Sequence, residues 1–198
     1  MRIEIRAKNN AIITGYVNVV GRESKEFLDI SGNFVEEIAI GAFARSLEEN
    51  KNVDLKFNHR TIIGSTNDNL TLKEDNIGLF ARAQITDPKI IAKAKQGLLT
   101  GWSFGFKAIK EHWEQRAKDN MRKRVIDALN LEEVSILDVE PAYVATSIEM
   151  RDGQQTLKEQ RAYGGGFELV DNSEPEKPPD DNMDATLKLK FEFLKGGL

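Results

Sequence analysis

His59 and Ser103 have the residue types and settings of a general base and a nucleophile. His59 directly follows residues 53–57, where apolar and charged side chains alternate as in a half-buried strand. A neutral imidazole can accept the proton of a serine hydroxyl, which then attacks a carbonyl carbon. The alternative interpretation of His59 is a histidine in a surface loop.

Ser103 lies between two aromatic residues in the stretch GWSFGF, residues 101–106. The glycines allow a substrate or a neighbouring backbone to come close, as a serine nucleophile requires. Trp102 and Phe104 alternate with Ser103, so one regular strand accommodates all three, unlike the nucleophile elbow of α/β-hydrolases. The alternative is that Ser103 is a small residue in a tightly packed strand.

An acidic partner for the imidazole is available in the apolar run LNLEEVSILD, residues 129–138. Alternation sends Glu132 and Glu133 to opposite faces of a strand, and a carboxylate that faces inward needs a partner. A histidine N–H is such a partner, and the carboxylate would fix the imidazole tautomer. Alternation does not choose between the two acids, and an edge strand with both partly solvated is the alternative.

Other kinds of chemistry find little support in the composition. The chain has no cysteine and only one other histidine, His112, in a charged stretch typical of a solvated loop. Phosphate-binding, dinucleotide-binding and zinc-protease motifs are absent, so we expect neither a cofactor nor a metal. The net charge of −4 argues against general nucleic-acid binding, although it leaves room for a local basic patch. No apolar run approaches the ~20 residues of a membrane helix, and no secretory signal is evident, so a cytosolic protein is expected.

Short strands are predicted through most of residues 1–150, with two helices among them. Residues 41–50 place Phe43 and Leu47 on one helical face. A second helix is expected to begin at Asp87-Pro88 and end near Gly97. Residues 107–124 are predicted as a hairpin connection or a mobile loop. From about residue 151 the chain becomes rich in glycine, proline and acids, which predicts a flexible tail over residues 151–198.

An ordered set of segments resembles the tailed-phage prohead maturation proteases, which are related to the herpesvirus assemblins. The resemblance covers roughly residues 1–150, and its segments are EIAIGAF (37–43), FNH (57–59) with IG (63–64), ED (74–75) with GL (78–79), GWSFGF (101–106), and LEEVS (131–135) with PA (141–142). His59 precedes Ser103 by 44 residues, and Glu133 follows 30 residues later. The order and the spacing of the whole set carry the resemblance.

The resemblance implies a mainly β, α+β fold with an assemblin-like β-barrel core and a few flanking helices. It implies Ser103 as nucleophile, His59 as general base and Glu133 as the third member, with Glu132 in reserve. Backbone N–H groups are expected to form the oxyanion hole, whose place the sequence does not give.

The resemblance also implies a role in virion assembly. Such a protease acts inside the procapsid in the host cytoplasm, removes the scaffolding segment of the major capsid protein and cuts itself. A homodimer is a further expectation, whereas nucleic-acid and membrane partners are not expected. The alternatives are a catalytically inactive scaffold or capsid-assembly module of the same fold, and a generic β-barrel binding domain.

Overall fold

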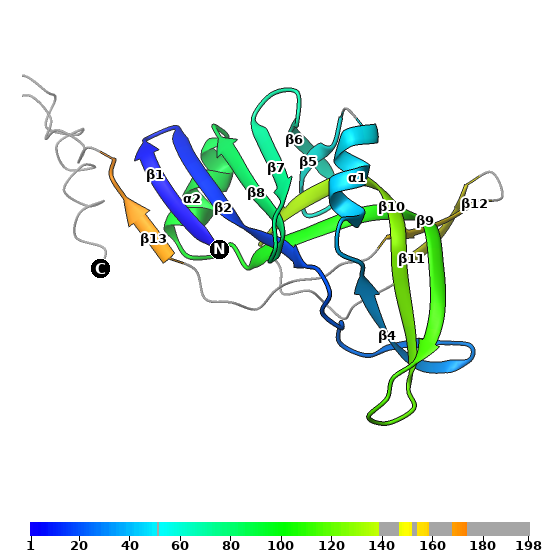
Figure 1. Ribbon diagram of the computed structural model, residues 1–198. Helices are drawn as coiled ribbons and strands as arrows, with labels where there is room; N and C mark the ends of the chain where they lie inside the picture. Colours follow the sequence, from blue (N-terminus) through cyan, green and yellow to red (C-terminus); the bar gives the residue numbers. More distant parts are fainter. Residues whose placement is uncertain (51, 139–146, 152–153, 159–167, 174–198) are drawn as a thin grey trace, which may run out of the picture.

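Strands dominate the computed structural model, which describes residues 1–50, 52–138, 147–151, 154–158 and 168–173 (Figure 1). Two short helices accompany the strands in this part of the chain, so the fold is mainly β with an α+β organisation, as expected. In chain order the elements are β1 (Arg2–Ala7), β2 (Asn10–Val19), β3 (Phe27–Asp29), β4 (Gly32–Ile38), α1 (Ala42–Glu49), β5 (Asp54–Phe57), β6 (Thr61–Ser65), β7 (Leu70–Glu74), β8 (Gly78–Ile85), α2 (Pro88–Lys95), β9 (Gly101–Gln115), β10 (Arg122–Leu137), β11 (Ser147–Arg151), β12 (Gln154–Lys158) and β13 (Glu168–Asp171).

Two sheets form the body of the protein and curl around a common core as a half-barrel (Figure 1). One sheet has the strand order β13-β1-β2-β8-β7, and the other has the order β3-β4-β10-β5-β6 with β9 paired to β10. Strand β10 pairs in parallel with β4 and with β5, and antiparallel with β9. Residues far apart in sequence therefore meet along β10.

Residues 107–124 belong to a long antiparallel ribbon of β9 and β10 and to the turn that joins them, so the mobile-loop alternative is wrong. Its turn is closed by backbone hydrogen bonds between Arg116 and Met121 and between Asn120 and Arg116, both 2.8 Å. Charged side chains pair across the ribbon, as Lys123 does with Glu114 at 3.0 Å. The charge of this segment thus reflects a solvated two-stranded ribbon, which was the hairpin alternative.

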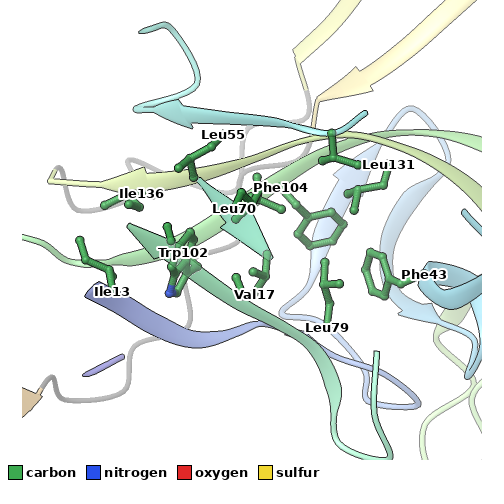
Figure 2. Packing of buried hydrophobic residues seen from close by; sticks show 14 of the residues in the cluster. Ile13, Val17, Phe43, Leu55, Leu70, Leu79, Trp102, Phe104, Leu131 and Ile136 are labelled. Carbon is green, nitrogen blue, oxygen red and sulfur yellow. The ribbon is translucent and has the colours of Figure 1, made fainter. Parts of the chain in front are cut away.

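The hydrophobic core fixes which way β9 faces. Trp102, Phe104 and Phe106 are buried in the cluster that fills the space between the sheets, and Figure 2 shows Trp102 and Phe104 beside residues of β2 and β8. Phe104 also meets Phe43 of α1 edge-to-face, with ring centroids 5.4 Å apart. Burial of each aromatic side chain contributes on the order of 2 kcal/mol. Because side chains alternate along a strand, Ser103 must point to the opposite face of β9.

Both helices begin where the sequence predicted, and acidic side chains satisfy backbone N–H groups at their starts. Asp87 accepts a hydrogen bond from the N–H of Lys89 at 2.8 Å, and Pro88 occupies the first position of α2. At the start of α1 the carboxylate of Glu74 accepts hydrogen bonds from the N–H groups of Gly41 and Ala44, both at 2.6 Å. The second cap comes from β7, so it could not be recognised as local sequence.

The segment predicted as a tail contributes one described strand to the body. Strand β13 lies parallel to β1, with Leu169 opposite Ile3. Strands β11 and β12 form a separate two-stranded sheet. The division into a domain over residues 1–150 and a tail over residues 151–198 stays a prediction. The motif residues 141–142 and residues 174–198 of the predicted tail lie outside the described residues.

Candidate active site

The face of the β9–β10 pair that turns away from the aromatic core carries two of the residues singled out in the sequence, Ser103 and Glu133. Ser103 lies directly opposite Ser135 in the antiparallel register, and Gly105 lies directly opposite Glu133. Opposed residues of antiparallel strands project to the same face, with Cβ atoms about 5 Å apart. The hydrophobic faces of β9 and β10 turn inward, so these four residues form one polar patch on the other side.

His59 approaches this patch from the turn between β5 and β6. Asn58 and His59 both have positive φ values, 52° and 59°, and the N–H of Arg60 donates to the carbonyl of Phe57 at 3.1 Å. Two central residues with positive φ characterise the type I′ turns that join tightly paired strands. Glycine is usual at the second of these positions, and a non-glycine residue there costs roughly 1 kcal/mol. Such a conformation marks a residue held in place for its side chain.

Hydrogen bonds from β10 and from the chain just after it hold this turn. Asn58 donates from its backbone N–H to the carbonyl of Ile136 at 3.0 Å. Two further bonds join Asn58 and Asp138. Nδ2 of Asn58 donates to Oδ1 of Asp138 at 2.7 Å, and the backbone N–H of Asp138 donates to Oδ1 of Asn58 at 3.1 Å. Lys93 of α2 pairs with the same carboxylate at 2.8 Å. The hydrogen bond from Lys93 lowers the pKa of Asp138, which therefore stays charged.

The imidazole of His59 meets the carboxylate of Glu133. His59 Nδ1 lies 2.5 Å from Oε1 of Glu133, and the two side chains are only 9% and 6% exposed. Burial raises the pKa of Glu133, but the hydrogen bonds with His59 and Ser135 and nearby positive charge together lower the pKa by more, so the net shift is downward. Glu133 is therefore ionised and can only accept hydrogen bonds.

A β-bulge separates the two candidate acids. The register passes from Leu131 opposite Phe106 to Glu133 opposite Gly105, so Glu132 is the extra residue. The side chain of Glu132 is 35% exposed and pairs with Lys107 at 3.0 Å, away from the imidazole. The bulge also explains why alternation could not choose between them, since it lets Leu131 and Val134 both face the core.

The hydrogen bonds around Glu133 determine the tautomer of His59. Oε1 accepts from His59 Nδ1, and Oε2 accepts from the hydroxyl of Ser135 at 2.8 Å. Because Glu133 has no proton to give, Nδ1 of a neutral His59 must carry the hydrogen and Nε2 must be the acceptor. Nε2 is buried and has no hydrogen-bond partner among the described residues. A basic nitrogen is thus available next to the polar patch.

Gly105 leaves the space that the Glu133 carboxylate occupies. A Cβ atom placed on Gly105 would lie 2.8 Å from Oε1 of Glu133, the oxygen that binds His59, and 2.9 Å from its Cγ. The sequence indicated close approach at this glycine, and the approaching group is the carboxylate. Gly105 therefore takes part in the site without bearing a side chain.

Replacing Gly105 with alanine should displace Oε1 of Glu133 and slow peptide cleavage at least tenfold, since displacements near 1 Å can cost about a hundredfold in rate. The strand should persist, because alanine is tolerated on a strand as well as glycine is. Steady-state cleavage rates of the wild type and of Gly105→Ala measure the effect, and thermal unfolding curves of the two proteins show whether the fold persists. A Gly105→Ala protein that cleaves at the wild-type rate would contradict the steric account.

The other residues of interest occupy separate places. Ser103 is fully buried and is not hydrogen-bonded to Nε2 of His59 in this structure. His112 lies on the β9–β10 ribbon, half exposed, with Nδ1 2.8 Å from Asp127. Sequence inspection missed Asn58, Asp138 and the hydroxyl of Ser135. Ser135 carried a recognisable signal, because it lies two residues after Glu133 and so shares its face.

No group of three or more histidine, aspartate or glutamate side chains among the described residues is placed to hold a metal ion. Neither helix in the same part of the chain has the length and apolar character that crossing a membrane requires.

Comparison with known proteins adds one finding to this geometry. A family model described as caudovirus prohead serine protease matches residues 1–160. The match includes β1 to β12 and every residue of the polar patch. Neither the curated proteins nor the solved structures gave a match.

Proposed function

Because the chain belongs to the caudovirus prohead serine protease family, and is thereby a serine protease of phage head maturation, we propose that Ser103 is its nucleophile, His59 its general base and Glu133 its orienting acid. The contact between Nδ1 of His59 and Oε1 of Glu133, 2.5 Å long and buried, carries this proposal. It joins two residues 74 positions apart on the face that also bears Ser103.

The proposed reaction proceeds through an acyl-enzyme. The Ser103 hydroxyl attacks the carbonyl carbon of the scissile peptide, and its proton passes to Nε2 of His59. His59 returns that proton to the departing amine as the C–N bond breaks, leaving an ester on Ser103. Water hydrolyses the ester by the same route, giving a carboxylic acid and restoring the hydroxyl. Glu133 stabilises the imidazolium formed in each half-reaction.

The proposed substrate is the scaffolding segment of the major capsid protein, followed by the protease itself. The protein would act inside the procapsid in the host cytoplasm, where enzyme and substrate are enclosed together, and a homodimer is part of the same proposal. Ser103 is fully buried. A substrate carbonyl therefore reaches the Ser103 hydroxyl only when the parts of the protein that cover Ser103 move aside.

A fluorophosphonate probe tests the mechanism without a known substrate, because the activated serine displaces fluoride from phosphorus and keeps the label. The two serines of the patch fall in different tryptic peptides, residues 96–107 for Ser103 and residues 125–151 for Ser135. Mass spectrometry should find the adduct in the first peptide, and His59→Ala should abolish it. An adduct on Ser135, or equal labelling of the His59→Ala protein, would overturn the assignment.

A catalytically inactive assembly module of the same fold is the competing function. The buried imidazole–carboxylate pair and the strained turn that presents it favour the enzyme, since a binding module has no use for either. Absence of labelling in a chain that folds and binds capsid protein would favour the module instead.

A further inference from the structure

Ser135 connects the acid and the base of the site through one hydroxyl group. Its Oγ donates to Oε2 of Glu133 at 2.8 Å and accepts the backbone N–H of His59 at 3.2 Å. The side chain is fully buried. A serine hydroxyl has one proton and two lone pairs, so these two bonds set its orientation.

This arrangement adds a restraint to each of two parts of the site, the Glu133 carboxylate and the His59 backbone. The terminal torsion of a glutamate side chain is soft, so a single contact with His59 does not fix the carboxylate plane. A second hydrogen bond to Oε2 fixes it. The bond from the His59 N–H supports a backbone in the left-handed region, where L-residues are disfavoured.

We propose that Ser135 is a positioning residue, which holds the Glu133 carboxylate and the His59 backbone in the arrangement that activates Ser103. The inference rests on the proposed function. It gives Ser135 no contact with the substrate, because its proton is directed at the carboxylate and its lone pair at the turn. Its effect on the rate must therefore pass through Glu133 and His59.

The test measures how fast a fluorophosphonate phosphonylates Ser103 in Ser135→Ala and Ser135→Thr proteins. Alanine should slow phosphonylation about ten- to a hundredfold, the range expected for losing a hydrogen bond to a charged group. Threonine keeps a hydroxyl and should restore most of the rate. A wild-type rate in the alanine variant would refute the inference.

A double-mutant cycle with Glu133→Gln separates positioning from simple structural support. If Ser135 acts through Glu133, then Ser135→Ala should cause little further loss in the glutamine background. A loss by the same factor in both backgrounds would overturn the role through Glu133, because that loss would not depend on the acid.

Ser46 provides the matched control. Its hydroxyl is also buried and accepts a backbone N–H of β10, that of Leu131 at 2.8 Å, but it does not touch the site. Ser46→Ala should lower the melting temperature without slowing the phosphonylation of Ser103 in the folded protein. If the wild type itself shows no label at Ser103, the proposed function fails. If it labels and Ser135→Ala labels equally fast, only the positioning role fails.

Discussion

Ser103→Ala should abolish cleavage of co-expressed major capsid protein while the protein still folds. Removing the nucleophile of a serine protease lowers kcat by roughly 10⁴-fold or more, and what remains would not convert visible amounts of substrate. The substitution removes a single oxygen from a buried strand, so the loss of stability should stay near 1–2 kcal/mol. Gel analysis of capsid protein co-expressed with each variant shows the precursor alone or the shortened product.

Two comparisons make this result specific to Ser103. Ser135→Ala removes the other serine of the same polar patch and should slow processing without stopping it. The purified wild-type chain should also shorten itself, whereas Ser103→Ala should keep its full mass. Unchanged capsid processing by a folded Ser103→Ala protein would rule out Ser103 as the nucleophile.

Local sequence patterns were sufficient for the elements that depend on nearest neighbours. The alternation over residues 53–57 predicted β5, and Asp87-Pro88 predicted the start of α2. The alternation of Trp102 and Phe104 with Ser103 predicted one regular strand, and all three lie in β9 with the two aromatic side chains buried in the core. In each case the period of side chains decides which residues share a face.

The site itself depends on features that the alternation of apolar and polar residues in the sequence does not reveal. The bulge at Glu132 changes the phase of β10, so a strict period of two could not identify the acid that meets His59. The turn at Asn58 and His59 has the conformation of an Asn-Gly hairpin turn, with histidine where glycine is usual. Both features are set by pairings across about 75 residues of sequence, which only the folded chain brings together.

Glu133→Gln and Glu132→Gln should differ sharply, although the two changes are chemically identical and adjacent. An amide at position 133 can present its NH₂ group to Nδ1 of His59, which would then be the acceptor and leave the hydrogen on Nε2. That tautomer cannot take a proton from Ser103, and the equivalent change in a well-studied serine protease triad costs about 10⁴-fold in kcat. We expect a loss of that order for Glu133→Gln, measured by capsid cleavage or by the rate of fluorophosphonate labelling.

Glu132→Gln should leave the rate within about twofold of wild type, because it affects only an exposed ion pair with Lys107. The pair of variants thus distinguishes the effect of position on the bulged strand from the effect of losing a negative charge. Similar losses in both would mean that charge in this region matters and that the contact with His59 does not. A large loss in Glu132→Gln alone would show that the exposed acid moves into the site when substrate binds.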